Sequence, residues 1–392
     1  MSNLRFCRKS PIQHTMNTLT HASDNAPHHA IVWADLARAK AFSQWLDGVA
    51  PSHCLNPESL RLASADASFR RYFRIDKCAG SAVRSCIIMD APPDKEDCAP
   101  FVKVAELMAG AGLEAPCVLA WDAPSGFMLL SDLGATTMME AVSPAAVAPA
   151  ACAAAPPSAL AHNLYTQATD ALIRWQLASK PGVLPAYDDA MLSRELALFA
   201  QWYVAKYRGF SMDTQQKRTL DDALTQIKTS NLQALDGARV YVHRDFMPRN
   251  LMVSSASTPR LGILDFQDAV YGPVSYDIAS LMRDAFLSWE EDFVLDVTVR
   301  YWQKARKAGL PVGDDFGEFY RAVEWMGLQR HLKILGIFAR LSLRDGKPKY
   351  LADTPRFIKY VRATAARYRQ LGPFMVLLDA IEGNETRVGY TF

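Results

Sequence analysis

Hydrophobic and polar positions repeat with two different periods along the chain. Strand-like segments, which are short and either alternating or wholly apolar, cover residues 60–62, 69–75, 85–89, 118–121 and 127–130. Helix-like segments, which repeat apolar side chains every three or four residues, cover residues 34–46, 101–111, 160–177, 192–203, 215–233, 316–341 and 357–369. This order predicts the α+β class, with a small antiparallel sheet first and a larger, mostly helical part after it.

The segment 69–75 shows the strand pattern best. The apolar side chains of Phe69, Phe73 and Ile75 alternate with polar ones, which predicts a strand with one buried face. A polar turn is predicted just before it, over residues 64–68. Hydroxyl, backbone N–H and guanidinium groups here are candidates for phosphate contacts, and a solvated strand face is the other interpretation. The candidates are Ser64, Ser68, Arg70, Arg71 and Arg74.

The chain has 392 residues, half of them hydrophobic, which is enough for two lobes with separate cores. We expect an N-terminal lobe over residues 31–131 and a C-terminal lobe over residues 132–380. Residues 143–157 are almost all Ala and Pro, a composition that predicts a flexible insertion. A disordered leader is expected over residues 1–30 and a tail over residues 381–392.

Charge and cysteine content exclude several classes of protein. The formal net charge is +2 and no basic stripe marks a nucleic-acid surface. No apolar run reaches membrane-spanning length, and residues 1–30 lack the apolar segment of a secretory signal. The seven cysteines are odd in number and none has metal-ligand spacing, which favours free thiols in a reducing cytoplasm. We expect a cytoplasmic monomer whose partner is a small molecule.

The candidate chemistry lies in two neighbouring stretches. Residues 241–250 read Tyr-Val-His-Arg-Asp-Phe-Met-Pro-Arg-Asn, which predicts a strand followed by a polar loop, and an apolar hairpin then ends on Asp265. Phosphoryl transfer from ATP needs a carboxylate beside the attacking hydroxyl and oxygen ligands for Mg²⁺. Asp245 is the candidate base, and Asn250 and Asp265 are the candidate Mg²⁺ ligands.

The motif resembles the signature of eukaryotic-type protein kinases. In both, His-Arg-Asp is followed after four residues by Asn, and an Asp-Phe pair stands at the end of the next hairpin. Gln267 stands where those kinases have glycine, and with this departure the chain resembles the aminoglycoside phosphotransferase-like small-molecule kinases. The implied fold is bilobal and protein-kinase-like. Longer strings resemble the cell-wall-recycling branch, which contains the anomeric N-acetylmuramate/N-acetylglucosamine kinases. These strings are residues 68–74, 89–93, 264–273 and 329–333.

The resemblance covers residues 34–378 apart from the insertion. It implies transfer of the ATP γ-phosphate to the C1 hydroxyl of an amino sugar, with Asp245 as base and Asn250 and Asp265 on Mg²⁺. It also implies that the segment of Asp132 and Leu133 is the hinge that meets the adenine.

Further roles follow from the same resemblance. His243 and Asp277 would support the catalytic loop, although Asp277 also suits the start of a helix, which Ser275 could cap. Asp268, Arg283 and Arg330 are candidate sugar contacts, and Arg330, Arg283 or Arg249 could pair with the lactyl carboxylate of muramate. A solvated helix face is the alternative for residues 329–331, and residues 271–273 are predicted to form a turn.

One element of the kinase pattern is missing. Protein kinases carry a phosphate-pairing lysine on the third strand, whereas residues 85–89 contain none and Met89 or a neighbour takes its place. Glu106, where a kinase has its helix glutamate, is then expected to be solvated. An arginine could substitute, the nucleotide could bind without this contact, or the chain could be a non-catalytic nucleotide-binding module. A kinase of an aminoglycoside, choline or homoserine is the other alternative.

Overall fold

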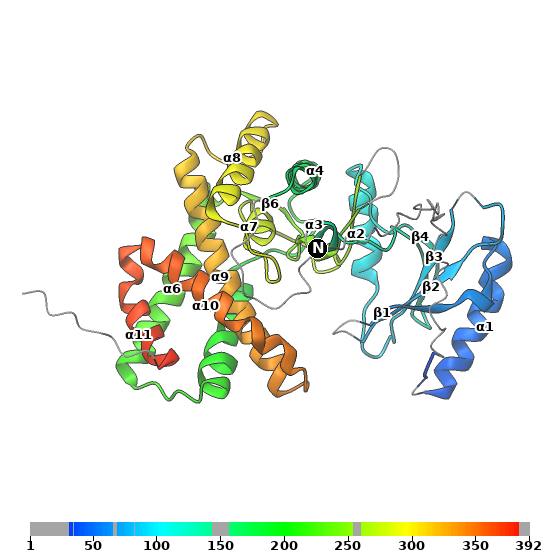
Figure 1. Ribbon diagram of the computed structural model, residues 1–392, viewed down its shortest axis with the longest axis horizontal. Coiled ribbons are helices and arrows are strands. Elements are labelled where there is room, and N and C mark those ends of the chain that lie inside the picture. Colours follow the sequence, from blue (N-terminus) through cyan, green and yellow to red (C-terminus); the bar gives the residue numbers. More distant parts are fainter. Residues whose placement is uncertain are drawn as a thin grey trace, which may run out of the picture.

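The computed structural model describes residues 31–33, 35–65, 69–81, 83–142, 157–253 and 260–383. An antiparallel sheet forms the N-terminal part of these residues, and a largely helical region follows it (Figure 1). The predicted α+β class is therefore confirmed. The expected leader, Ser68 and nearly all of the expected insertion lie outside the described residues.

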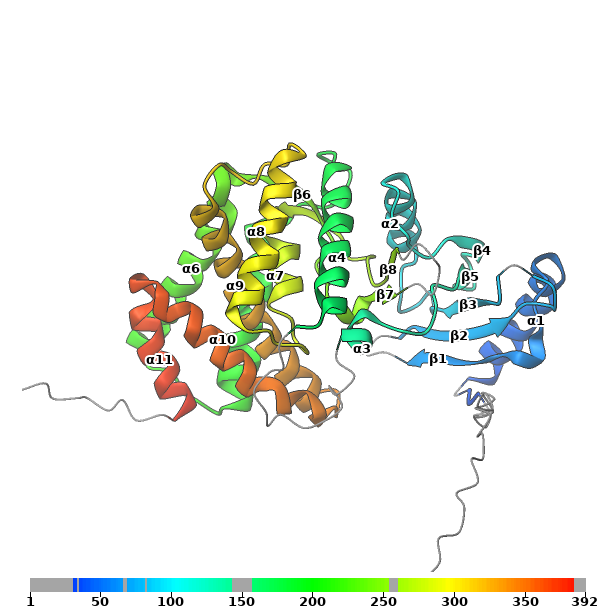
Figure 2. The ribbon, with the colours of Figure 1, turned by 45° about the horizontal axis from the view of Figure 1, so that its top comes forward.

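Five antiparallel strands form the N-terminal sheet, seen side by side in Figure 2. In spatial order they are β1 (Arg61–Ala65), β2 (Arg71–Asp76), β3 (Ser85–Asp90), β5 (Phe127–Ser131) and β4 (Val118–Asp122). Helix α1 (Leu36–His53) begins at Asp35, whose carboxylate accepts the backbone N–H groups of Ala37 and Arg38. Its Phe42 packs edge-on against Phe127 of β5, so α1 covers one face of the sheet.

Strand β2 begins two residues later than predicted, at Arg71 instead of Phe69. Phe73 and Ile75 are fully buried as expected, but Phe69 is 61% exposed and precedes the strand. The prediction for Phe69 was wrong because the strand begins at Arg71, whose guanidinium occupies the end of the buried face. Arg71 lies 3.9 Å from the ring centroid of Trp33 and bonds the buried carboxylate of Asp90 at 2.6 Å.

Helix α2 (Ala99–Gly110) lies between the sheet and the helical region (Figure 1). The predicted lobe boundary falls between β5 and the short helix α3 (Met138–Val142). The helices that follow are α4 (Ala159–Leu177), α5 (Asp189–Leu198), the π-helical η2 (Phe199–Tyr207), α6 (Thr214–Gly237), α7 (Tyr276–Met282), α8 (Glu291–Lys307), α9 (Phe316–Leu343), α10 (Thr354–Arg367) and α11 (Gly372–Glu382). Ile381 and Glu382, which the prediction gave to the tail, belong to α11.

Two short ladders carry the segments that hold the candidate residues. Strand β6 (Arg239–Val242) pairs with β9 (Val270–Pro273), and β7 (Leu251–Val253) pairs with β8 (Leu261–Ile263). The turn predicted at residues 271–273 is wrong, since these residues form β9. The other predictions for this region are confirmed: strand β6, the loop that follows it, and the hairpin of β7 and β8.

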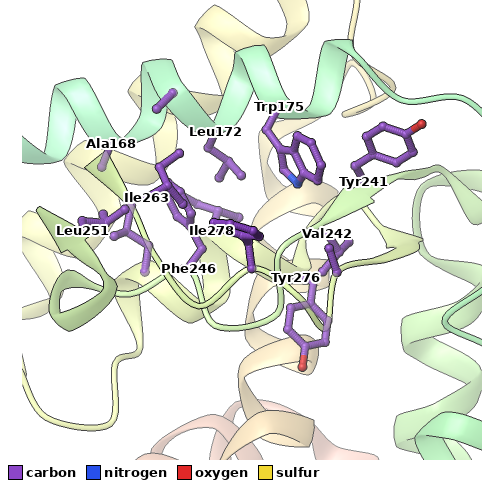
Figure 3. Close-up of a cluster of buried hydrophobic side chains, with 14 of the residues drawn as sticks. Ala168, Leu172, Trp175, Tyr241, Val242, Phe246, Leu251, Ile263, Tyr276 and Ile278 are labelled. Carbon is purple, nitrogen blue, oxygen red and sulfur yellow. The ribbon is translucent and has the colours of Figure 1, made fainter. Parts of the chain in front are cut away.

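Below the loop between β6 and β7 lies a buried apolar cluster (Figure 3). Trp175 of α4 packs against Tyr241 of β6 with ring centroids 4.9 Å apart. Phe246, within the loop, is 1% exposed and points into the same cluster as Ile278 of α7. Burial of such side chains contributes roughly 1.5–3 kcal/mol each. The loop therefore rests on a packed support.

Candidate active site

A cleft of about 980 Å³ runs between the sheet and the helical region. Its walls come from β2, β3 and β5, from the segment between β5 and α3, from the loop after β6, and from the segment between α9 and α10. We call residues 132–137 the hinge and residues 243–250 the catalytic loop. The lining side chains include Ile87, Leu130, Leu133, Asn250, Asp265 and Phe286.

Asp245 presents its carboxylate at the surface of the catalytic loop. The side chain is 39% exposed, and one oxygen lies 3.9 Å from a terminal nitrogen of Arg330. The backbone N–H of Asp245 donates to Nδ1 of His243, and Nε2 of that ring lies 3.0 Å from the carbonyl oxygen of Leu264. Burial lowers the pKa of His243 to about 4, so the ring is neutral at pH 7. His243 therefore links the catalytic loop to the hairpin that ends on Asp265.

Asp277 supports the loop from beneath. Its two carboxylate oxygens accept the backbone N–H groups of His243 and Arg244 at 2.7 and 3.0 Å. Arg244 has a φ of 77°, in the left-handed region that a non-glycine residue rarely adopts. Ser275 makes no side-chain bond at the start of α7, so the expected cap is absent. The position of Asp277 is that of a brace, and burial raises its pKa to about 7.

Asn250 and Asp265 lie side by side on the floor of the cleft. The Asn250 amide nitrogen donates to the backbone oxygen of Asp245 at 2.9 Å and lies 3.3 Å from a carboxylate oxygen of Asp265. Asp265 also has a left-handed backbone, with a φ of 62°, and Gln267 donates to its other oxygen at 2.9 Å. One amide and one carboxylate fit a cation that completes its shell with water and phosphate oxygens, as Mg²⁺ does.

The hinge is tied to the sheet by a carboxylate. Asp132 accepts two bonds from Arg74 of β2, at 2.6 and 3.0 Å, and one from Ser85 of β3 at 2.7 Å. Burial opposes ionisation of Asp132, but the bonds from Arg74 and Ser85 hold its pKa below the usual value. Leu133 lines the cleft and packs so closely on Gly262 that a Cβ there would lie 2.9 Å from its Cδ1.

The cleft face of β3 is apolar. Ile87 lines the cleft, and Met89, two residues on, is fully buried. Arg74 lies opposite Ile87 on β2 and also lines the cleft, but its guanidinium is held by Asp132. Glu106 of α2 is exposed, as expected for a glutamate without a lysine partner.

Arg70 is 9% exposed and forms an ion pair with Glu96 at 3.0 Å. Its predicted role in nucleotide binding stays a prediction, as does that of Ser68, which lies outside the described residues.

The three predicted sugar contacts have different environments. Arg330 of α9 is 4% exposed, bonds the backbone oxygen of Arg244 and reaches toward Asp245, which places it at the catalytic loop. Asp268 is 65% exposed, and one oxygen lies 4.0 Å from Arg244. Arg283 turns instead to Glu291, with a nitrogen–oxygen distance of 3.1 Å. Of these three residues, Arg330 alone approaches the carboxylate of the candidate base.

Glu195 is a residue that the sequence analysis missed. This α5 carboxylate is 7% exposed and accepts bonds from Arg244 at 2.6 Å, Lys333 at 2.8 Å and Gln329 at 2.8 Å. Burial alone would raise its pKa, but the charges of Lys333 and Arg244 lower the pKa of Glu195 to about 2. Glu195 therefore anchors the arginine of the catalytic loop to α5 and links both to α9. A single glutamate within an amphipathic helix pattern gives no warning of this role.

His331 gives the protein a predictable response to acid. It is 1% exposed, its Nε2 lies 3.2 Å from the backbone oxygen of Arg283, and its ring stacks on Tyr360 at 4.8 Å. Burial lowers the pKa of His331 to about 3, against 6.5 for an exposed ring. Its contribution to stability is present above pH 6.5 and is lost as the pH falls toward 3, at about 1.4 kcal/mol per pH unit.

We expect the His331→Phe variant, measured by urea unfolding, to lose less stability than the wild type between pH 7 and pH 5. The difference should be about 2 kcal/mol, because the unfolded wild type gains one proton at this site and the variant gains none. His243 contributes with the same sign in both proteins and cancels. An equal pH dependence in the two proteins would show that His331 titrates normally in the native state.

No helix among the described residues is both long and apolar enough to cross a membrane. In the same part of the chain, no cluster of three or more His, Cys, Asp or Glu side chains has the arrangement of a metal site.

The fold resembles that of solved small-molecule kinases. The choline kinase from Cryptosporidium parvum aligns with a TM-score of 0.55 and 10% identity over 86% of this chain and 99% of its own. A putative aminoglycoside phosphotransferase from Ralstonia eutropha aligns with a TM-score of 0.54 and 13% identity, over 83% of this chain and 96% of its own. At these identities the likeness concerns the fold alone.

Two curated proteins have much higher sequence identity to this chain than these solved structures do. The N-acetylmuramate/N-acetylglucosamine kinase of Pseudomonas aeruginosa is 45% identical over 358 residues, which are 89% of this chain and 98% of that protein. The enzyme of the same name from Neisseria meningitidis is 45% identical over 363 residues, 91% of this chain and 100% of that protein. The model of the phosphotransferase enzyme family, APH, matches residues 59–316, a range that holds the hinge, the catalytic loop and Asp265. With this match added to the fold and the cleft, the chain belongs to the APH phosphotransferase enzyme family.

Proposed function

We propose that this protein transfers the γ-phosphate of ATP to the anomeric C1 hydroxyl of N-acetylmuramate and N-acetylglucosamine. The observation that carries the proposal is the 45% identity to two enzymes named for these sugars, over nearly the full length of each. The arrangement of the candidate residues supports it: Asn250 and Asp265 line the cleft, and the Asn250 amide bonds the backbone oxygen of Asp245. A base and a pair of oxygen ligands are what phosphoryl transfer requires.

In this proposal Asp245 orients the C1 hydroxyl and accepts its proton. A bond forms between the hydroxyl oxygen and the γ-phosphorus, and the bond from that phosphorus to the β–γ bridging oxygen breaks, which leaves ADP. Arg330, within 3.9 Å of Asp245, keeps positive charge beside the reacting oxygens. Asn250 and Asp265 would hold Mg²⁺, which supplies neutralisation of the charge on the phosphate oxygens.

The hinge would receive the adenine. The Asp132 carboxylate is already bound to Arg74 and Ser85, so its contribution to nucleotide binding is to fix the hinge backbone rather than to contact the base. The apolar side chains of Ile87 and Leu133 line the cleft beside it and suit a planar ring. We further propose a monomer that acts in the cytoplasm, in keeping with the five described cysteines, which are all free.

The test is ADP release with Mg-ATP and a panel of acceptors: N-acetylmuramate, N-acetylglucosamine, kanamycin, choline and none. We expect turnover with the two amino sugars only, an acid-labile sugar 1-phosphate as product, and loss of turnover when EDTA removes the magnesium. A product stable to mild acid would contradict transfer to C1. Turnover with kanamycin or choline alone would be consistent with the proposed roles of the catalytic residues but would refute the assignment of an amino sugar as the substrate.

A further inference from the structure

The cationic side chains around the catalytic loop divide into two groups. Five are held by carboxylates of the protein: Arg74 by Asp132, Arg244 and Lys333 by Glu195, Arg283 by Glu291, and Arg330 at a longer distance by Asp245. Arg249, Lys347 and Lys349 line the cleft, and no carboxylate of the described chain lies within ion-pair distance of any of them. The second group can therefore bind an anionic ligand without losing an internal partner.

Aromatic rings connect two of these cations, Arg249 and Lys349. The guanidinium of Arg249 lies 4.8 Å from the ring centroid of Phe286, which also lines the cleft. Phe286 and Tyr350 both contact Phe338, with ring centroids 6.4 and 5.1 Å apart, and the ammonium of Lys349 lies 5.3 Å from the Tyr350 ring. A cleft wall of rings bordered by cations suits a sugar that carries a negative charge.

The wall adjoins the catalytic residues. Arg249 directly precedes Asn250 in the short helical turn η3 (Pro248–Asn250) and follows Asp245 by four residues. Asp353, an acidic side chain on the same wall, is neutralised by Arg356 at 3.4 Å. The wall therefore keeps a net positive charge close to the position proposed for the acceptor.

The two proposed acceptors differ by one charged group. N-acetylmuramate carries a lactyl ether on C3, which C2 separates from C1, and N-acetylglucosamine has a hydroxyl there. We propose that Arg249, together with Lys347 and Lys349, forms the subsite that binds this lactyl carboxylate and sets the preference for N-acetylmuramate. The inference rests on the proposed function. A planar guanidinium can bind a carboxylate through two parallel bonds, which makes Arg249 the principal member.

The experiment compares kcat/KM for both sugars in the wild type and in the Arg249→Gln, Arg249→Lys and Lys347→Gln variants. We expect Arg249→Gln to lower the ratio of the N-acetylmuramate value to the N-acetylglucosamine value by about 10- to 100-fold, mainly through KM, as the loss of one charged hydrogen bond predicts. Arg249→Lys should recover part of the ratio and Lys347→Gln should lower it less. Lys359→Gln, which removes the same charge from an exposed position on α10, is the matched control and should leave the ratio unchanged.

If the wild type used both sugars and the variants kept the wild-type ratio of the two kcat/KM values, the inference would be refuted and the proposed function would stand. If the variants lost kcat/KM equally for both sugars and had a higher KM for ATP, the cations would be assigned to the nucleotide phosphates, and the inference would again be refuted. A wild type that uses neither sugar would refute both. Lys347 is half-exposed, so Lys347→Gln keeps the test decisive if Arg249→Gln does not fold.

Discussion

Replacement of Asp245 by Asn is expected to lower kcat by about 10²- to 10⁴-fold, the usual contribution of a general base. The amide has nearly the shape of the carboxylate but cannot accept the proton of the attacking hydroxyl. The loop should keep its conformation, because the bonds that hold it come from the backbone and from Asp277 and Asn250. Binding of Mg-ATP should change little, since the proposed metal ligands Asn250 and Asp265 are untouched.

Single-turnover phosphorylation of N-acetylglucosamine measures the chemical step, and a Mg-ATP titration measures nucleotide affinity. The control is Asp222→Asn, the same change at an exposed position on α6. If Asp245→Asn retained a near-normal rate of phosphoryl transfer, Asp245 would not be the base. A large loss of Mg-ATP affinity would instead assign its carboxylate to the metal.

Replacement of Glu195 by Gln is expected to lower the free energy of unfolding by about 3–5 kcal/mol, as happens when one partner of a buried ion pair is removed. The carboxylate neutralises Arg244 and Lys333, whose side chains are only 18% and 12% exposed. Without it, both cations lose their close partner, and Arg244 keeps only the exposed carboxylate of Asp268 at 4.0 Å. We also expect kcat to fall, because Arg244 then loses the bond that fixes it to α5.

Urea unfolding and steady-state turnover measure the two effects. Glu106→Gln is the matched control, since Glu106 is exposed on α2 and should lose almost no stability. A stability loss below about 1 kcal/mol in Glu195→Gln would mean that water or a rearranged side chain already compensates the two cations.

The sequence allowed prediction of the features that depend on local pattern. The strand before His243, the loop to Asn250 and the hairpin that ends on Asp265 each have a clear apolar period and a polar end, and the structure contains all three. The chemical groups of the site follow one another within 21 residues, so their proximity could be inferred from the order of the elements.

Other features depend on contacts between distant segments and could not be predicted. Helix α8 has apolar positions at helical spacing but was not predicted, and its Glu291 turns out to hold Arg283. Strand β9 was taken for a turn, because Tyr-Gly-Pro is a turn sequence and its partner β6 lies some thirty residues away. Glu195 lies about fifty residues before Arg244, and no spacing rule connects the two.

Two residues of the proposed active site, Arg244 and Asp265, keep left-handed backbones that cost roughly 1–2 kcal/mol each in a non-glycine residue. Glycine would relieve this strain at either position but would remove a side chain that the site uses. A variant selected for heat resistance alone could therefore gain stability at the expense of turnover. Selection for thermal stability and selection for activity therefore oppose each other at these two positions. Stabilising substitutions should be sought elsewhere in the chain.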